Sequence, residues 1–103
     1  MNDFEQPDPL VHAPVRLAIL SAIMSVKSAD FTFLRDSIHT TDGNLSIHLS
    51  KLEEAGYVEI EKEFVDKRPK TTCSITDKGR AAFSDYVKTL ENYLYPDSDG
   101  DNG

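Results

Sequence analysis

The sequence predicts a small, mainly helical α+β domain with a single β-hairpin between its third and fourth helices. Three observations favour this fold class: a leucine stripe within residues 41–56, a period of two within residues 57–65, and a return to helical spacing after Thr76. Helices repeat every 3.6 residues and strands every two, so each period indicates one type of element. Because 103 residues suffice for only one modest core, we expect a single domain.

The stretch TDGNLSIHLSKLEEAG, residues 41–56, has the clearest helical pattern. Leu45, Leu49 and Leu52 recur at i, i+4 and i+7, which gives the helix one apolar face. Thr41 suits the N-cap and Gly56 suits a left-handed position just after the helix. The other face carries short or medium side chains with one full cation: Asn44, Ser46, Ile47, His48, Ser50 and Lys51. Such a face suits the reading of shape and hydrogen-bonding edges better than catalysis.

A first helix is expected from Pro14 to about Val26, because the fixed φ of proline suits the first helical position. Its apolar residues form two stripes, one with Leu17 and Leu20 and the other with Ile19. Two apolar stripes need two partners. One partner would be the domain core, and the other a neighbouring helix or a second subunit.

A short second helix is expected in FTFLRDSI, with Thr32 as its N-cap and Phe33 and Leu34 among its buried residues. Phe31 is expected in a strand of one or two residues. Only His39 and Thr40 then separate this helix from the leucine-striped one. Two helices joined by so tight a turn have helix-turn-helix geometry, in which the second helix can enter the major groove of DNA.

The hairpin follows Gly56. Val58, Ile60 and Phe64 alternate with glutamates in YVEIEKEFV, and KTTCSI returns after an expected loop at residues 66–69. Asp and Pro suit the tip of a hairpin. Residues 62–70 contain four bases and two acids, which makes them the locally basic part of the chain.

A long last helix is expected to start after Thr76 as its N-cap. Phe83, Val87, Leu90 and Leu94 share one stripe, and tyrosines 86, 93 and 95 lie near it. The outer part of so long a helix has little surface of the same small domain left to pack against. We therefore expect the first and last helices to pack across a twofold homodimer interface, with the tyrosines in that interface rather than around a ligand. This order of elements is a winged helix.

The net charge of −7 would argue against nucleic acid as a partner, but the tails carry most of it. Three acids precede His12 and three follow Tyr95, which leaves 12 acids against 11 bases between them. We expect a flexible acidic segment at residues 1–11, the winged-helix domain at 12–95 and a disordered acidic tail at 96–103.

The sequence has no run of about 18–20 apolar residues, so we expect no membrane span. The acidic, proline-containing N-terminus resembles neither a signal peptide nor a transit peptide, and the expected location is therefore the cytoplasm. The lone Cys73 cannot form an internal disulfide and is expected to be a small buried residue rather than a redox switch.

Four segments together resemble a known family: VHAPVRLAIL, DFTFLRDSI, TDGNLSIHLSKLEEAGYVEIEK and RPKTTCSITDKGRAAF. Over residues 11–94 the chain resembles small single-domain winged-helix transcriptional regulators of the MarR/ArsR type. The resemblance implies a homodimer that binds double-stranded DNA, with the third helix in the major groove and the wing on the backbone or minor groove. It assigns base or nearby phosphate contacts to Thr41, Asn44, Ser46, Ile47, His48 and Lys51, and backbone contacts to Lys67, Arg68 and Lys70.

Other kinds of site are not expected. The three histidines and Cys73 lack the close spacing of metal ligands, and no paired carboxylates, phosphate-binding glycine loop or nucleophile–base signature indicates an enzyme. We expect no cofactor, and an effector of unknown nature would have to bind at the dimer interface. The alternative hypothesis is a winged helix that has lost DNA binding and holds a protein partner through Ile47 or its last helix.

Overall fold

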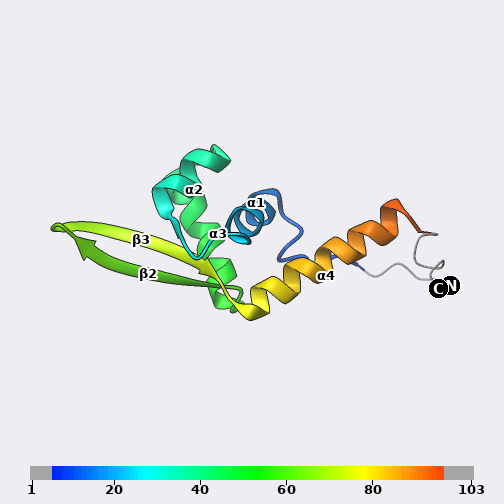
Figure 1. Cartoon of the computed structure of the whole chain (residues 1–103). Coiled ribbons are helices and arrows are strands. Elements are labelled where there is room, and N and C mark those ends of the chain that lie inside the picture. The colour runs from blue at the N-terminus through cyan, green and yellow to red at the C-terminus, as the bar shows by residue number, and fades with distance from the viewer. Residues whose placement is uncertain (1–5, 97–103) are drawn as a thin grey trace.

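The computed structural model describes residues 6–96, which form an α+β domain with the expected order of helices and hairpin. The elements are α1 (Pro14–Ile23), β1 (Ala29–Asp30), α2 (Phe31–Ile38), α3 (Asp42–Glu54), β2 (Val58–Val65), β3 (Arg68–Ile75) and α4 (Asp77–Leu94). The first three helices form a compact body, from which the hairpin and α4 project in opposite directions (Figure 1). The molecule is therefore elongated, with extents of 57 × 22 × 22 Å.

One core joins the helices to the base of the hairpin. The leucine stripe of α3 is fully inside it, since Leu45, Leu49 and Leu52 are at most 2% exposed. It packs with residues of the other helices and of the hairpin: Val11, Ile19, Leu20, Ile23, Ala29, Leu34, Val58, Cys73 and Tyr86. Val11 is also fully buried, so the packed part of the chain begins before the expected boundary at His12. Residues 1–5 and 97–103 of the expected acidic tails lie outside the described residues.

Three predictions about the helix ends are confirmed: the two threonine N-caps and the left-handed glycine after α3. The Thr41 hydroxyl accepts the N–H of Asn44 at 3.1 Å, and the Thr76 hydroxyl accepts the N–H of Gly79 at 2.9 Å, so each threonine caps its helix. Gly56 has φ = 82°, the left-handed conformation expected after α3. The ends of α3 and the start of α4 therefore follow from local hydrogen-bonding chemistry.

The three strands form one antiparallel sheet in the order β1-β3-β2. In the hairpin, which we call the wing, Val58 pairs with Ile75 and Val65 with Arg68. The short β1 pairs Ala29 with Cys73 and Asp30 with Thr72. The sheet thus has three strands at its base and two in the projecting part of the wing.

The prediction that α1 extends to about Val26 was wrong, because the helix ends at Ile23. The chain turns at Met24, whose carbonyl oxygen accepts a hydrogen bond from Nη1 of Arg80 at 3.0 Å. This contact with α4 provides a partner for a carbonyl near the end of α1. Val26 is consequently 42% exposed instead of extending an apolar stripe.

The start of α2 was also predicted wrongly. Its N-cap is Asp30 rather than Thr32, because β1 runs directly into the helix, and Phe31 is its first helical residue rather than part of a strand. Starting there, α2 turns Leu34 into the core and leaves Phe33 58% exposed. The expectation that Phe33 is buried was therefore wrong.

The wing turn is shorter than the expected loop at residues 66–69. Only Asp66 and Lys67 form it, with φ of 53° and 66°, whereas Arg68 and Pro69 belong to β3. Two positive φ values fit a two-residue hairpin turn, and aspartate tolerates this conformation. Because Val65 and Arg68 flank such a turn, the next pair, Phe64 and Pro69, is not hydrogen-bonded, and proline costs the hairpin no bond there.

Tyr86 of α4 lies in the chain's own core, so the expectation that it packs in an intersubunit interface was wrong. It is 5% exposed, and its hydroxyl lies 3.0 Å from Nδ1 of His12. The segment before α1 provides this partner. Among the described helices, none combines the length and apolar character needed to cross a membrane.

Candidate nucleic-acid interface

The outer face of α3 is available to a large ligand. Leu45, Leu49 and Leu52 fix the orientation of the helix, and on the opposite side Ile47 is 57% exposed. Four other residues that the sequence assigned to this site are also exposed: Thr41, Asn44, Ser46 and Lys51. His48 alone in this group is half-buried. Most of the candidate residues of α3 therefore share one accessible surface.

Hydrogen bonds arrange the turn and the start of α3. Nδ2 of Asn44 donates to Oγ1 of Thr40 at 2.8 Å, which fixes the direction of the amide. Nη1 of Arg35 on α2 donates to Oδ1 of Asp42 at 2.8 Å, and this pair raises the pKa of Arg35. Asp42 also lies in the first turn of α3, where a carboxylate is favourable. Its charge is thus partly neutralised beside the exposed face.

His48 contacts α1, which the sequence did not predict. Nη1 of Arg16 lies 3.1 Å from its Nδ1, and Nε of Arg16 donates to the Leu10 carbonyl oxygen at 2.6 Å. Partial burial, followed by the charges of Arg16 and Lys51, lowers the pKa of His48. Nothing in the local sequence links Arg16 to His48, because they are 32 residues apart.

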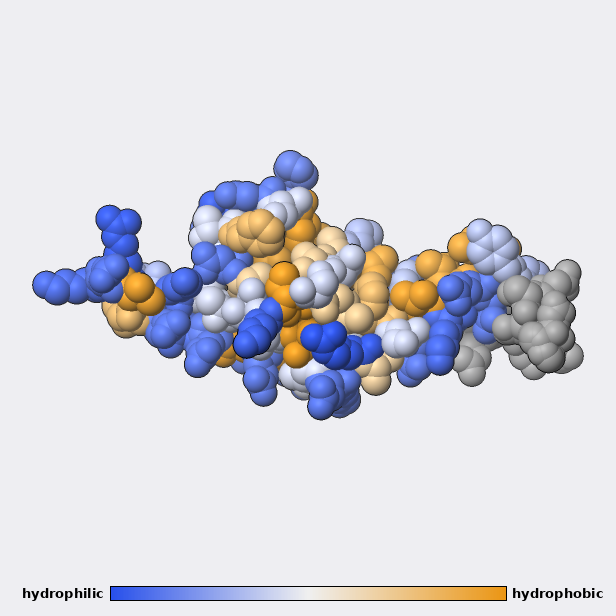
Figure 2. All heavy atoms as spheres, in the orientation of Figure 1, coloured by the Kyte–Doolittle hydropathy of each residue, from blue (hydrophilic) through white to orange (hydrophobic). Residues whose placement is uncertain are grey.

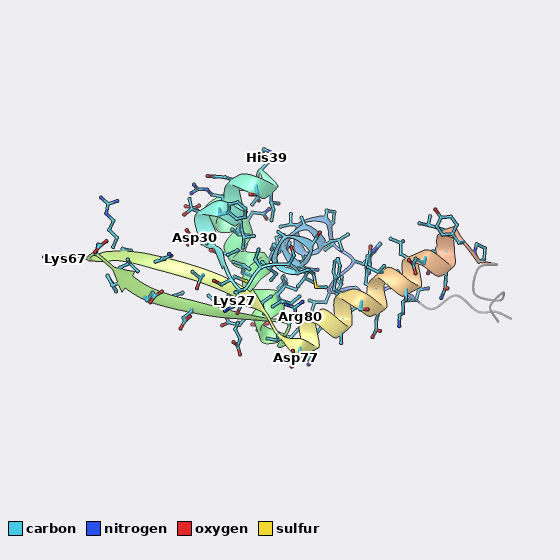
Figure 3. All side chains as sticks on the ribbon, in the orientation of Figure 1. Lys27, Asp30, His39, Lys67, Asp77 and Arg80 are labelled. Atoms are coloured by element: carbon cyan, nitrogen blue, oxygen red, sulfur yellow. The ribbon has the colours of Figure 1, made fainter. Side chains whose placement is uncertain are left out.

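The wing presents its cations on two different faces. Partners paired across strands point to the same face, and successive residues alternate. Lys62 therefore shares the face of Val58 and Ile60, which at the base packs against the helices, whereas Arg68 and Lys70 point to the other face. Lys67 lies at the outer tip (Figure 3). The four basic residues of the wing, which are close together in the sequence, thus do not form one continuous patch on its surface.

Lys62 lies beside α3, although it was not among the predicted contact residues. With Thr71 it lines one side of a groove whose other side includes Ser46 and Ser50 of α3. The sequence did contain a signal for this position, because Lys62 continues the alternation of Val58 and Ile60. Ser46 thus faces the wing side of α3.

Lys70 has a nearby acid. Its Nζ lies 4.0 Å from Oδ1 of Asp30, and both side chains are 45% exposed. At this distance and exposure the pair contributes little to stability. It nevertheless places a negative charge beside one of the expected phosphate contacts.

Cys73 and the histidines lie in separate environments. Cys73 is 1% exposed, and burial together with the charge of Glu53 raises its pKa to about 12. Within residues 6–96, no group of three or more His, Cys, Asp and Glu side chains is placed to hold a metal ion. A buried thiol with so high a pKa is nearly all protonated at neutral pH and reacts slowly.

Comparison with known proteins agrees with this geometry. The family model of the winged helix DNA-binding domain matches residues 15–94. An uncharacterized protein of Methanocaldococcus jannaschii is 41% identical over 78 residues, which cover 76% of this chain and 85% of that protein.

Solved structures show the same architecture. The transcriptional regulator homologue protein from Pyrococcus horikoshii OT3 matches with a TM-score of 0.78 and 30% identity, over 82% of this chain and 84% of that one. The transcriptional regulator BldR from Sulfolobus solfataricus matches in fold, with a TM-score of 0.66 and 24% identity over 78% of this chain and 56% of that one. The chain belongs to the winged helix DNA-binding domain family, and its similarity to a solved transcriptional regulator homologue agrees with the expected MarR-type winged-helix fold.

Proposed function

We propose that this protein regulates transcription as a homodimer that binds double-stranded DNA sequence-specifically. The observation that carries the proposal is the orientation of α3, whose leucine stripe is buried while Ile47 on the opposite face is 57% exposed. In this proposal α3 lies in the major groove, where an α-helix fits and each base pair presents a distinct pattern of groups. Asn44 would pair with adenine, and Ile47 would contact a thymine methyl group.

The remaining candidate residues take two roles. Thr41, Ser46, His48 and Lys51 contact base edges or nearby phosphates, and Lys67, Arg68 and Lys70 contact the backbone or the minor groove. The projection of the wing from the body supports the second group, because its tip can reach DNA beyond the segment that α3 occupies (Figure 1). Lys62 on the α3 side of the wing is a further candidate for a phosphate contact.

The exposed stripe of α4 supports the homodimer. Val87 is 38% exposed and Leu94 is 61% exposed, and they share one helix face with Phe83 and Leu90. Figure 2 shows apolar side chains on the surface over the outer half of α4. Packing α4 and α1 against a second copy would cover this stripe and pair two α3 helices with half-sites about one helical turn, roughly 34 Å, apart.

A binding experiment tests the proposal. DNA selected by the wild type from a random duplex library is titrated at low salt by fluorescence anisotropy. We expect Arg68→Glu to weaken binding at least about tenfold, because it replaces an attraction to phosphate by a repulsion. Lys88→Glu makes the same charge change on an exposed part of α4 and should bind as the wild type does.

Two results would contradict the proposal. A wild type that selects no duplex at low salt would favour the alternative, a winged helix that holds a protein partner. Equal binding by the wild type and Arg68→Glu would exclude Arg68 from the proposed DNA contact.

A further inference from the structure

The contact between Arg16 and His48 connects the segment before α1 with the DNA-reading helix. Arg16 is held from one side, because Nε donates to the Leu10 carbonyl oxygen at 2.6 Å and Nη2 donates to that of Pro9 at 3.5 Å. From the other side, Nη1 lies 3.1 Å from Nδ1 of His48 on α3. The guanidinium therefore meets the imidazole in a fixed place.

The chemistry of this contact determines where the imidazole proton lies. A guanidinium has only N–H donors and cannot accept a hydrogen bond. Nδ1 of His48 must therefore be the acceptor, and the proton of the neutral ring must be on Nε2. A charged imidazolium would place an N–H against Nη1 of Arg16, so the contact also disfavours protonation. The lowered pKa of His48, caused by burial, Arg16 and Lys51, agrees with a neutral ring.

The Nε2 atom reaches the surface. In the part of the chain that the structure describes, every buried side-chain nitrogen or oxygen has a hydrogen-bond partner, and Nε2 of His48 has none within that part. If Nε2 of His48 were inaccessible, it would be a buried nitrogen without a partner, and the described residues contain no such atom. Nε2 is therefore accessible to solvent. His48 also lies at i+4 from Asn44, next to Lys51 one turn further, so its outer nitrogen belongs to the stripe of α3 that faces DNA in the proposed function.

We infer that Arg16 is a positioning residue that holds His48 as the neutral Nε2–H tautomer, so that α3 presents a single N–H donor to DNA. The group that His48 meets is then a hydrogen-bond acceptor. Guanine O6 and N7, adenine N7, thymine O4 and a phosphate oxygen qualify, whereas the amino group of cytosine does not. This inference rests on the proposed function for its DNA contact, but the tautomer is a property of the free protein.

The tautomer is tested first, without DNA. Long-range ¹H–¹⁵N correlation spectra of the histidine rings at neutral pH should show an unprotonated Nδ1 and a protonated Nε2 for His48. In Arg16→Met, which keeps an unbranched apolar side chain up to the ε position but removes the guanidinium donors, the ring should become a mixture of tautomers. His39, the C-cap residue of α2, is not among the hydrogen-bond partners of Arg16 and should give the same signals in both proteins. An Nδ1–H tautomer or an imidazolium in the wild type, or unchanged His48 signals in Arg16→Met, would overturn the role of Arg16.

The DNA contact is tested with two substitutions that each mimic one ring nitrogen. His48→Gln places an amide group near the position of Nε2 and keeps an outward donor, whereas His48→Asn places its amide near Nδ1 and loses that donor. We expect His48→Gln to bind within about threefold of the wild type and His48→Asn to bind about tenfold more weakly, the cost of one hydrogen bond in each subunit. Equal binding by the two variants would overturn the donor role.

Two further results locate the acceptor and separate this inference from the proposed function. If the loss in His48→Asn disappears when one base pair of the site is changed, the acceptor is a base edge, and a uniform loss over all sequences indicates a phosphate. Duplex binding by the wild type together with equal affinities of the two variants removes the donor role and leaves the proposed function intact. A wild type that binds no duplex refutes the proposed function and the DNA contact together, whereas the tautomer result stands by itself.

Discussion

The carbonyl oxygen of Tyr57 lies directly against the α-carbon of Gly79, at the junction between the base of the wing and α4. A Cβ atom at position 79 would collide with this oxygen and would lie 2.9 Å from Cγ1 of Ile75. The Tyr57 oxygen cannot easily move aside, because it accepts the N–H of Thr76 at 3.0 Å. The start of α4 is therefore fixed to the wing by backbone contact, close to where the two elements diverge (Figure 3).

Gly79→Ala should destabilise the domain by about 1–3 kcal/mol, since the clash outweighs the better helix propensity of alanine. The midpoint of urea unfolding, followed by circular dichroism, measures the change. Gly43→Ala is the matched control, because nothing lies within 4 Å of its added Cβ atom. That variant should be unchanged or up to about 1 kcal/mol more stable. Equal stabilities of the two variants would contradict the close approach at Gly79.

Leu94→Glu should convert the proposed homodimer into a monomer, because it places a charge on the exposed apolar stripe of α4. Light scattering at micromolar concentration should give twice the mass of the chain for the wild type and one chain mass for the variant. Asn92→Glu adds the same charge on the opposite side of α4 and should remain dimeric. A wild type with the mass of one chain would disprove the dimer.

DNA binding should depend strongly on salt. Three neutralised phosphates in each subunit give a slope of about −5 for log K against log salt concentration, at about 0.9 per phosphate. Arg68→Gln should make this slope shallower by about 2, since the dimer loses two contacts. Lys88→Gln on α4 should leave it unchanged. The measurement is a series of anisotropy titrations between about 50 and 200 mM salt. An identical slope for Arg68→Gln would exclude this residue from phosphate contact.

Tyr57→Phe should lower the free energy of unfolding by about 1 kcal/mol at neutral pH, because it removes the bond from the tyrosine hydroxyl to Oδ2 of Asp8. This bond is the main reason that the pKa of Tyr57 rises from 10.0 to about 12, with smaller contributions from burial and from the charge of Asp8. A raised pKa in the folded state stabilises the fold below pH 10 and loses this effect as the pH rises toward 12.

Two measurements check this dependence. The difference in the free energy of unfolding between the wild type and Tyr57→Phe should shrink between pH 10 and 12. In an ultraviolet titration, the wild type should contain a tyrosine that ionises near pH 12, and this tyrosine should be absent from the variant. Asp8→Asn keeps an acceptor near the hydroxyl but removes the charge, so the pKa of Tyr57 should fall toward its ordinary value. A constant difference over this pH range would contradict the Asp8 contact.

Cys73 should not react with a thiol reagent in the folded protein at mildly alkaline pH. It is 1% exposed and its pKa is about 12, so only about one molecule in 10⁴ carries the reactive thiolate at pH 8. Unfolding in concentrated urea should make it react at the rate of a free cysteine. Mild oxidant should leave DNA binding unchanged. A fast reaction in the folded state would contradict the buried position.

The elements that the sequence predicted correctly are those specified by residues close together in the chain. Thr41 and Gly56 bracket α3 through hydrogen bonds and backbone conformations that need only their immediate neighbours. Thr76 starts α4 in the same way. The buried face of α3 and the alternation of the wing strands could also be predicted from one segment each, because the first follows the 3.6-residue period of a helix and the second the two-residue period of a strand.

Three of the predictions that failed depend on distant partners. α1 ends before the predicted residue, where Arg80 of α4 donates a hydrogen bond to the Met24 carbonyl oxygen. α2 starts before the predicted residue, directly after the strand in which Ala29 pairs with Cys73. Tyr86 points to the core because His12 meets its hydroxyl there. None of these partners lies within one helical turn of the residue that it affects.

For the candidate site, the sequence by itself determined which helix presents an exposed face and most of the residues on that face, since a leucine stripe at helical spacing admits one orientation toward a core. Only the tertiary structure decided that Arg16 meets His48, that Lys62 lies beside α3, and that Arg68 and Lys70 point to the other side of the wing. Helix periodicity fixes directions within one element. Distances between elements depend on packing and strand register, which contacts far apart in the chain establish together.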